Sequence, residues 1–501
     1  MNMESRMEVS EALEKARNYE QTYVTEEVNA QKPSFHACAP IGWINDPNGF
    51  SLYKGEYHLF YQYYPYEKKW GPMHWGHSVS KDLITWKELP AAMAPDKDYD
   101  HAGCFSGSAL EYQGKHILLY TGVKEEKTEQ GTCVRQTQCL AVGDGINYEK
   151  ISENPVICPE GLPKGSSLED FRDPKIWQEG ESFYAVAGSR SRDGSGQIPL
   201  YTSKNLKDWS LVSIIDQCQN RYGKMWECPD FFFLDGKAVL LTSPQDMESE
   251  DFEFHSGNGT LCIMGTCSKE DWVLHREQVQ AIDYGLDFYA PQTTLTPDGR
   301  RVMVAWLQSW DNYLSPESLY WGGMMTIPRE LSVKEGRLYQ NPVRELEKYH
   351  GKKTIAKKIP VQEKQSLEGV QGRQIDLTLE LQGDEYENFT IYLAMKERHF
   401  TKVTYDRTQG ILTFDRRHSG TRRDFIHTRE MAVEEKEGKL KLRILIDKYS
   451  VEIFVNDGEK AMTSLVYTEL DAQEIAFEAK GQALLSLCCC QMEKYPDSYH
   501  K

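Results

Sequence analysis

The strongest constraint on the fold is a short pattern that occurs five times, at intervals of 56 to 66 residues. Each copy is a turn glycine followed by an apolar strand, and the copies begin at Gly55, Gly114, Gly180, Gly236 and Gly299. A fixed period of this length indicates an architecture built from one recurring supersecondary unit. Five units of strand, glycine turn and further strands, set around one axis, form a β-propeller whose sheet edges are short and protected.

A second repeated element predicts four strands in each unit. Three segments share a Ser-Lys turn that leads to a tryptophan, and their tryptophans follow a repeat glycine by 29 to 36 residues. These segments are residues 80–86, 203–209 and 268–272. We interpret them as turns from the third strand of a blade into its fourth.

The rest of the chain has two other patterns. Residues 9–29 carry apolar side chains at three- and four-residue steps, which predicts an amphipathic helix that ends before Pro33. After about residue 345 the 60-residue repeat is lost, and period-two strands such as 375–381, 440–446 and 451–455 predict an antiparallel β-sandwich.

The sequence therefore predicts an all-β protein with a short N-terminal helix, a five-bladed β-propeller and a C-terminal β-sandwich. The expected domains are an N-terminal helical segment (1–32), a catalytic propeller (33–345), a charged linker (346–360) and the sandwich (361–501).

Charge and cysteine use restrict the partners and the compartment. The 501 residues carry a net charge of −18, which argues against nucleic acid or an anionic membrane as a partner. No run of eighteen apolar residues occurs, and the first residues have no apolar signal-peptide core. Because the twelve cysteines are scattered singly, apart from a run at 488–490, we expect reduced thiols in a cytoplasmic protein.

Three of the five repeats carry an acid at nearly the same place. Asp46 and Glu227 lie nine residues before their glycines, and Asp173 lies seven residues before its own. If the repeats are blades around one axis, these three carboxylates converge on a central cavity, which is an arrangement suited to catalysis.

The neighbours of each acid suggest a role. Asp46 precedes Pro47, Asn48 and Gly49, so the strand is expected to end just after it, with a plain surface turn as the alternative. Arg172 is expected to keep Asp173 ionised, unless the two form only a structural ion pair.

Glu227 lies beside Met225 and Trp226, and apolar surroundings favour the protonated form that a general acid needs. The alternative is a glutamate at a strand end that faces water. One ionised and one protonated carboxyl group on either side of a sugar bond is the pattern for glycoside hydrolysis. His74 and His77 have a metal-compatible spacing, but no acidic motif accompanies them, so no metal site is predicted.

With these motifs in hand, the chain resembles the invertase and sucrose-6-phosphate hydrolase family, the β-fructofuranosidases of glycoside hydrolase family 32. The resemblance begins at Trp-Ile-Asn-Asp-Pro-Asn-Gly (43–49) and extends over nearly the whole chain. The other matching stretches are residues 60–62, 71–77, 104–108, 171–174, 226–230, 321–330 and 451–458. One local departure, at residues 100–103, affects only the shape of a loop.

The resemblance implies a retaining double displacement on a small sugar substrate, without cofactor or metal. It makes Asp46 the nucleophile, Glu227 the general acid and then base, and Asp173 with Arg172 the group that binds the fructose hydroxyls. The same resemblance implies that the fructose pocket is lined by Asn45, Gln62, Trp70, Phe105 and Ser106.

The expected substrates are sucrose, sucrose 6-phosphate or short fructans. A fructosyltransferase or fructan exo-hydrolase would use the same three acids. A non-catalytic fructan-binding propeller and an inverting relative that acts on arabinose or xylose are further alternatives. A phosphate would need a basic pocket, and one basic cluster in the sandwich could supply it or could be a solvated hairpin: Arg416, Arg417, His418, Arg422 and Arg423.

Overall fold

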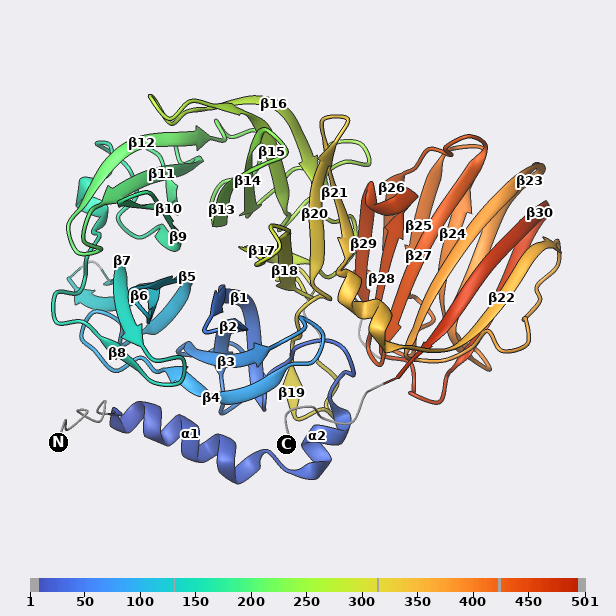
Figure 1. The fold of residues 1–501 in the computed structure, drawn as a ribbon, viewed down its shortest axis with the longest axis horizontal. Coiled ribbons are helices and arrows are strands. Elements are labelled where there is room, and N and C mark those ends of the chain that lie inside the picture. Colours follow the sequence, from blue (N-terminus) through green and yellow to red (C-terminus); the bar gives the residue numbers. More distant parts are fainter. Residues whose placement is uncertain (1–8, 130, 313–314, 422–424, 494–501) are drawn as a thin grey trace.

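The chain forms a five-bladed β-propeller beside a β-sandwich, with two short helices against the first blade (Figure 1). The computed structural model describes residues 9–129, 131–312, 315–421 and 425–493. This architecture confirms the predicted fold class.

The propeller has four strands in each blade, and the first strand of each blade lies nearest the axis (Figure 1). Blade I contains β1 (Gly42–Tyr53), β2 (Glu56–Tyr64), β3 (His74–Ser80) and β4 (Lys87–Met93). Blade II contains β5 (Gly103–Tyr112), β6 (Lys115–Thr128), β7 (Gly131–Gly143) and β8 (Tyr148–Lys150). Blade III contains β9 (Phe171–Glu179), β10 (Ser182–Arg190), β11 (Gly196–Ser203) and β12 (Trp209–Gln217). Blade IV contains β13 (Trp226–Leu234), β14 (Lys237–Pro244), β15 (Leu261–Cys267) and β16 (Leu274–Ala281). Blade V contains β17 (Tyr289–Leu295), β18 (Arg301–Trp306), β20 (Arg329–Lys334) and β21 (Arg337–Pro342).

The repeated glycines have a common structural role. All five lie in the turn between the first and second strands of a blade, with φ between +57° and +86°. A residue with a Cβ atom is strained in this left-handed region, so the turn selects glycine. The three Ser-Lys segments lie between the third and fourth strands, as predicted.

A short strand closes the ring of blades. Strand β19 (Trp321–Gly322), from the segment between β18 and β20 of blade V, pairs in parallel with Gly42 and Trp43 of β1. A bridge between Cys38 and Met324 extends this contact. Blade V is therefore hydrogen-bonded to blade I, so the last blade of the propeller is joined to the first.

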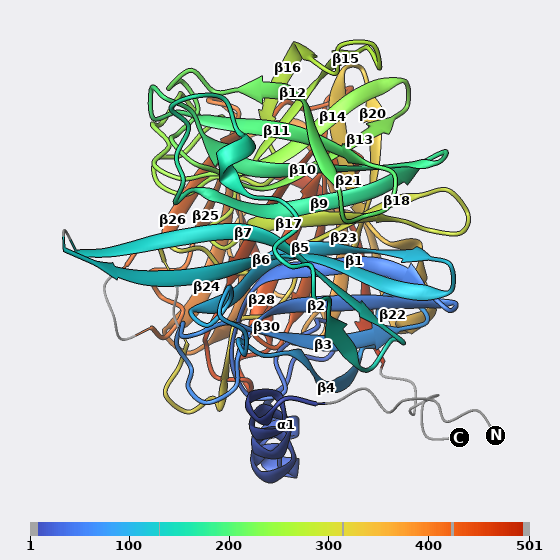
Figure 2. The ribbon, with the colours of Figure 1, turned by 90° about the vertical axis from the view of Figure 1, so that its left-hand side faces the viewer.

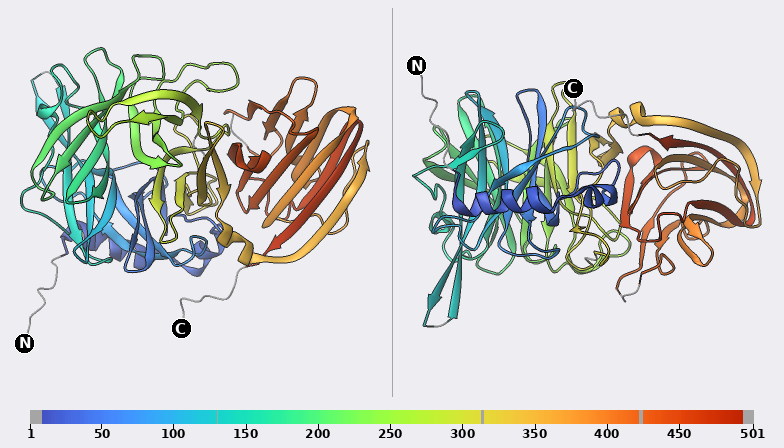
Figure 3. Two further views of the ribbon diagram at one scale, coloured as in Figure 1. Left: turned by 45° about the horizontal axis from the view of Figure 1, so that its top comes forward. Right: turned by 90° about the horizontal axis from the view of Figure 1, so that it is seen from below.

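The N-terminal segment contains two helices rather than the single predicted one. Helix α1 (Glu11–Tyr23) ends at Val24, and α2 (Glu26–Gln31) starts after Thr25, whose hydroxyl accepts a hydrogen bond from the Val28 amide. An N-cap of this kind starts a new helix and interrupts the periodic pattern. Helix α1 runs along β4, the outer strand of blade I (Figures 1, 2 and 3).

The sandwich begins earlier than predicted. Strand β22 (His350–Val361) occupies most of the expected linker and pairs with β30 (Glu474–Met492) at an edge of the sheet. Its lysines face solvent, and charged side chains are typical of edge strands, which is why its composition resembles that of a linker. Only the 3₁₀ turn at Arg344–Tyr349 separates the two domains.

The long strand β23 (Ile375–Lys396) joins the two halves of the sandwich. Its first half pairs with β27 (Lys439–Asp447) and its second half with β24 (His399–Asp406), while β30 runs along most of its length. The remaining strands are β25 (Ile411–Asp415), β26 (Thr428–Ala432), β28 (Ser450–Val455) and β29 (Lys460–Leu465).

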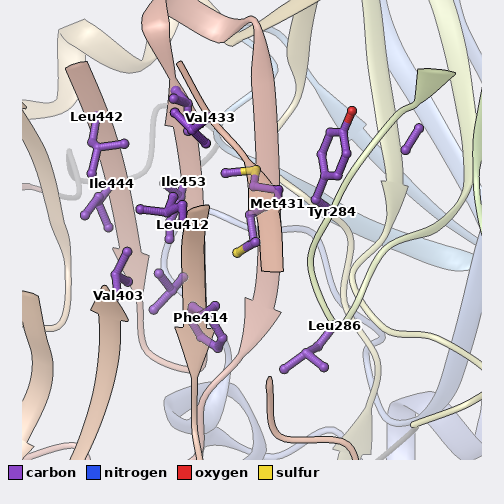
Figure 4. Close-up of a cluster of buried hydrophobic side chains, with 14 of the residues drawn as sticks. Tyr284, Leu286, Val403, Leu412, Phe414, Met431, Val433, Leu442, Ile444 and Ile453 are labelled. Carbon is purple, nitrogen blue, oxygen red and sulfur yellow. The ribbon is translucent and has the colours of Figure 1, made fainter. Parts of the chain in front are cut away.

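The sandwich core continues into the propeller. Figure 4 shows Tyr284 and Leu286, from the loop before β17, facing Phe414 and Met431 of the sandwich. All four side chains belong to one cluster of buried apolar residues. Such a continuous apolar contact favours a fixed relation between the domains.

Buried ion pairs cross the same interface. The Arg329 guanidinium lies 3.0 Å from Asp283 in the propeller and 2.5 Å from Glu452 in the sandwich, and all three side chains are at most 1% exposed. His36 bridges Asp447 and Glu452, at 2.9 Å from each. Burial lowers the pKa of His36, but the hydrogen bonds to the two carboxylates outweigh it and raise the pKa to about 9.

We expect Arg329→Met to destabilise the protein by about 3–5 kcal/mol, because it leaves the buried Asp283 without its cation and Glu452 with His36 alone. Urea unfolding at pH 7 measures this change. Arg344→Met is the matched control, since the Arg344 side chain is 64% exposed and its pair with Glu330 contributes at most about 1 kcal/mol. Equal unfolding free energies for the two variants would contradict the role given to Arg329.

Candidate active site

The first strand of every blade is interrupted at the same level near the axis. The pairing register shifts around Asp46 in β1, Ser106 in β5, Cys228 in β13 and Ala290 in β17, and blade III has the same shift around Asp173. Such bulges are typical of places where a strand must re-aim a side chain next to an active site.

These bulges correct the expectation that the first strand ends just after Asp46. Strand β1 continues to Tyr53, because one register shift lies between Ile44 and Pro47, a second lies between Asn48 and Ser51, and pairing with β2 resumes after each. The acid thus lies within the strand, where pairing on both sides of the bulge holds its backbone.

The bulges also correct the assumed equivalence of the three acids. In four blades the re-aimed residue stands directly before a proline, and three of these residues have positive φ: Asp173 (+64°), Cys228 (+48°) and Ala290 (+52°). Asp46 and Asp173 occupy this position, but in blade IV it is Cys228. Glu227 lies one residue earlier, where blades III and V carry Arg172 and Tyr289.

The three predicted acids meet across the axis. The Cys228 amide donates to Asp173 Oδ2 at 3.1 Å, and the Cys228 thiol donates to Asp46 Oδ2 at 3.5 Å. Arg172 Nε lies 3.0 Å from Glu227 Oε1 and 4.0 Å from Asp173 Oδ2. The first, third and fourth blades therefore contribute carboxylates to one cluster.

The two oxygens of Asp46 have different surroundings. Oδ2 accepts a hydrogen bond from the Ser106 hydroxyl at 2.9 Å, whereas Oδ1 is buried and makes no hydrogen bond within the described part of the chain. Burial and the negative charge of Glu227 raise the pKa of Asp46 to about 6, although Asn45, Ser106 and Cys228 act in the opposite direction. At neutral pH the group is therefore ionised and has one uncapped oxygen.

Glu227 lies among polar groups, which differs from the apolar surroundings that the sequence suggested. Arg172 contacts Oε1 at 3.0 Å, and the Tyr289 hydroxyl donates to Oε2 at 2.6 Å. The Tyr289 oxygen also lies 3.1 Å from the Ser243 carbonyl oxygen. The Tyr289 hydroxyl can donate a hydrogen bond to an ionised Glu227, or donate to the Ser243 carbonyl oxygen and accept a hydrogen bond from a protonated Glu227.

Arg172 contacts several acceptors, and not only Asp173, its neighbour in the chain. Its guanidinium also lies 2.9 Å from Asp170 and 3.2 Å from Gln136, so it is shared among several acceptors. Burial raises the pKa of Asp173 to about 7 in spite of Arg172, with a further increase from Glu227 and Asp46. Arg172 therefore opposes the effect of burial on the pKa of Asp173 but does not cancel it.

The raised pKa of Asp173 predicts a pH-dependent cost to stability. The ordinary pKa is 3.8 and the folded value about 7, so the folded protein binds more protons between these limits and loses stability as pH rises through them. We expect Asp173→Asn to be more stable than the parent by a few kcal/mol at pH 8, and by less at pH 5.

Thermal unfolding at several pH values checks this prediction. Asp98→Asn, in an exposed loop, is the matched control for the loss of one negative charge. If Asp173→Asn unfolds at the same temperature as the parent at pH 8, or at a lower one, burial of this carboxylate does not carry the expected cost.

The residues predicted to line the fructose pocket differ in their burial and in their contacts. Asn45 is buried and accepts a hydrogen bond from Trp43 Nε1 at 2.9 Å. Phe105 and Ser106 border the bulge of β5, and Trp70 is 48% exposed with its ring 5.9 Å from that of Phe105. Gln62 is buried, and its side-chain amide donates to the Cys104 carbonyl oxygen of β5 at 2.9 Å.

Two contacts at the site escaped the sequence reasoning. Tyr289 touches Glu227, and Cys228 touches both aspartates. The sequence signal that could have found them is a proline at each bulge. Aligning the inner strands on Pro47, Pro174, Pro229 and Pro291 puts Tyr289 and Cys228 among the two residues that precede each proline, where the three acids also lie. An aromatic cluster beside the acids also contains Trp43, Trp306 and Trp310.

The histidine pair is held by hydrogen bonds within blade I, and Arg417 and His418 of the basic cluster line a surface pocket of the sandwich. His74 is bonded to the Pro72 carbonyl oxygen and His77 to His58, each at 2.9 Å. Within the described ranges, no three His, Cys, Asp or Glu side chains are arranged to hold a metal ion. Arg416 is buried and pairs with Asp287 of the propeller at 2.6 Å, so it is not a solvated hairpin residue, while Arg422 and Arg423 lie outside the described residues.

Comparison with known proteins agrees with this geometry. The model of the glycosyl hydrolases family 32 N-terminal domain matches residues 36–342, and the model of the family 32 C-terminal domain matches residues 345–488. The chain belongs to glycosyl hydrolase family 32. This confirms the family that the motifs indicated.

Individual relatives are similar over nearly the whole chain. A raffinose invertase of Escherichia coli is 36% identical over 462 residues, which cover 91% of this chain and 94% of the relative. A sucrose-6-phosphate hydrolase of Escherichia coli is 35% identical over 466 residues, with coverage of 91% and 94%. The structure of a Bombyx mori GH32 beta-fructofuranosidase superposes with a TM-score of 0.83 at 31% identity, covering 96% of this chain and 99% of that one.

Among the described helices of this chain, none is long and apolar enough to cross a membrane.

Proposed function

We propose that this chain is a retaining β-fructofuranosidase that cleaves the β-fructofuranosyl bond of sucrose or sucrose 6-phosphate. The observation that carries the proposal is the cluster of Asp46, Asp173 and Glu227 at the propeller axis, in which Cys228 joins the two aspartates and Arg172 joins Asp173 to Glu227. Relatives named invertase and sucrose-6-phosphate hydrolase support the substrate class.

In the first step, Asp46 attacks the anomeric carbon of the fructosyl unit. Oδ1 is the attacking oxygen, because the Ser106 hydroxyl and the Cys228 thiol already occupy Oδ2. Glu227 transfers its proton to the bridging oxygen, so the glucosyl unit leaves as a neutral alcohol and the fructosyl unit becomes esterified to the enzyme.

In the second step, Glu227 removes a proton from water, and the oxygen of that water attacks the same carbon. Asp46 is released as a carboxylate and fructose leaves with its original configuration. Tyr289 suits this alternation, since it has an acceptor in Ser243 when Glu227 is protonated and an acceptor in Glu227 when it is ionised.

Asp173 and Arg172 bind and orient the fructosyl hydroxyls in this scheme. Asp173 is held by the Cys228 amide, and its own amide donates to the Thr121 hydroxyl at 2.9 Å. Because burial raises the pKa of Asp173 to about 7, the carboxyl group can accept or donate a hydrogen bond at neutral pH. Asn45, Phe105 and Ser106 border the same space.

The test is fructose release from sucrose, sucrose 6-phosphate, raffinose and short fructans under identical conditions. The proposal predicts fructose as the first product, with the highest kcat/KM on sucrose or its 6-phosphate. Product analysis at high sucrose separates hydrolysis from transfer, because a transferase forms oligosaccharides in place of free fructose. No fructose from any of these sugars would overturn the proposal.

We also propose a cytoplasmic location. All twelve cysteines are free thiols, including the adjacent run at 488–490. Free thiols in this number are typical of a reducing compartment. Fractionation of cells that express the chain tests this directly.

A further inference from the structure

We propose that the sandwich carries a second binding site, a pocket for a phosphorylated sugar that none of the catalytic acids lines. A cavity of about 460 Å³ opens between two turns of the sandwich. The turn from β23 into β24 supplies Arg398 and His399, and the segment after β25 supplies residues 417–421. A volume of this size lies within the range of pockets for organic ligands, about 300–1,000 Å³.

The lining of this sandwich pocket is rich in nitrogen donors. Four of its eight residues are arginine or histidine, namely Arg398, His399, Arg417 and His418. The chain as a whole has a net charge of −18, so the concentration of cations here is a local departure from its acidic surface. An arginine can bind a phosphate group through two parallel, charge-assisted hydrogen bonds. The lining therefore favours a ligand with a phosphate group.

Two acids at the pocket are already paired with cations. Asp415 lies 2.7 Å from Arg417 Nη2 and 3.8 Å from Lys402 Nζ. Among the lining residues that the structure describes, Glu469 is the one acid, and it lies 3.7 Å from Lys396 Nζ. Because lysines outside the lining offset these carboxylates, the charge of the lining cations is not cancelled.

The donors that face a ligand are available. Within the described part of the chain, the side chains of Arg398 and His399 make no ion pair and no hydrogen bond. Arg417 uses Nε and Nη2 to contact Asp415, which leaves its Nη1 for another acceptor. A phosphate group can therefore bind here without breaking an existing contact.

The frame of the pocket is fixed by its own hydrogen bonds. Arg416, directly before the lining segment, is buried and pairs with Asp287 of the propeller at 2.6 Å. Its carbonyl oxygen accepts hydrogen bonds from the Ser419 amide at 3.1 Å and the Ser419 hydroxyl at 2.8 Å. The Phe400 amide donates to the His418 carbonyl oxygen at 2.9 Å, which joins the two turns. A preformed pocket of this kind lowers the entropic cost of binding.

Aromatic rings beside the cations suit the sugar part of the ligand. The His418 ring lies 5.0 Å from the Phe400 ring at an interplanar angle of 34°, and Tyr467 lines the pocket. A tyrosine combines an apolar ring with a polar hydroxyl group, which matches the mixed surface of a sugar. The cavity is also larger than a phosphate ion needs, so it fits a phosphorylated hexose better than free phosphate.

The test is isothermal titration calorimetry of the full chain with glucose 6-phosphate, inorganic phosphate and glucose as separate probes. We expect Arg398→Gln to raise the Kd for glucose 6-phosphate about tenfold, because it removes charge-assisted hydrogen bonds to the phosphate. Inorganic phosphate and glucose should each bind the parent several-fold more weakly than glucose 6-phosphate. Turnover of sucrose by Arg398→Gln should equal that of the parent, since the catalytic acids do not line this pocket.

Arg344→Gln is the matched control, because it removes one arginine that is 64% exposed and pairs with Glu330 of the propeller. It should keep the parental Kd. Equal Kd values for glucose 6-phosphate in the parent, Arg398→Gln and Arg344→Gln would overturn the inference, as would the absence of saturable binding to the parent.

Inorganic phosphate or glucose binding the parent as tightly as glucose 6-phosphate would overturn the assignment to a phosphorylated sugar. Because the readout is binding, a parent that releases no fructose would overturn the proposed function and leave this inference intact.

Discussion

Asp46→Ala is expected to lower kcat for sucrose by about 10⁴-fold or more while the fold is retained, because the variant lacks the carboxylate proposed to attack the anomeric carbon. The variant should be at least as stable as the parent enzyme. Burial and Glu227 raise the pKa of Asp46 to about 6, so the ionised carboxylate costs folding free energy at neutral pH. Initial rates and thermal unfolding measure the two effects.

Ser106→Ala is the matched control for Asp46. It removes a hydrogen bond to Oδ2 and leaves the attacking oxygen in place, so kcat should fall much less than in Asp46→Ala. Added azide should restore turnover in Asp46→Ala, because the small anion fits the space of the missing carboxylate, and the product should be a fructosyl azide of inverted configuration. A variant that keeps near-parental activity without azide would show that Asp46 is not the nucleophile.

Glu227→Gln should lower kcat/KM for sucrose by about 10²- to 10⁴-fold, since a glutamine cannot protonate the leaving glucosyl oxygen. The loss should depend on the leaving group. An aryl fructoside with a strongly acidic phenol needs no proton to depart, so its first step should be nearly unaffected. Its second step should be slow, because water has lost its base, and a burst of phenol should precede a slow steady state.

Tyr289→Phe separates the proton donor from its support. The phenylalanine keeps the ring and removes only the hydroxyl group that lies 2.6 Å from Glu227 Oε2. We expect a smaller loss than in Glu227→Gln and a shifted pH profile of kcat/KM. Equal losses of kcat/KM on sucrose and on the activated fructoside in Glu227→Gln would contradict the assignment of Glu227 as general acid.

The fold was predictable from the sequence because its repeat is encoded by backbone geometry. Each blade needs a left-handed turn between its first two strands, and glycine at Gly55, Gly114, Gly180, Gly236 and Gly299 meets that need. The three acids were predictable because they stand at nearly fixed offsets from these glycines. Both signals depend only on local chain geometry.

The missed details depend on contacts between distant residues. A bulge adds one residue to a strand without changing composition, so the offset of Glu227 from the Asp46 position was not visible. The partners of Arg172 come from three different blades, and its proximity to Asp173 in the chain was misleading. Strand β22 resembled a linker because its exposed edge carries lysines.

The role of the sandwich also emerges only from the folded structure. Arg416 belongs to the basic cluster that could bind a phosphate or form a solvated hairpin, yet it is buried against Asp287, two residues before Tyr289 of the site. Arg329 and Glu452 form a second buried contact across the interface. The sandwich therefore supports the blade that supplies the partner of Glu227, which a reading of its period-two strands could not reveal.

The central claim is that Asp46 becomes covalently fructosylated at the propeller axis. The most direct measurement is peptide mapping by mass spectrometry of Glu227→Gln after rapid acid quenching of its reaction with an activated aryl fructoside. The account predicts one fructosyl residue attached to Asp46, in the peptide that contains residues 43–49. A label on any other residue, or no label together with fructose first released in the inverted configuration, would contradict it.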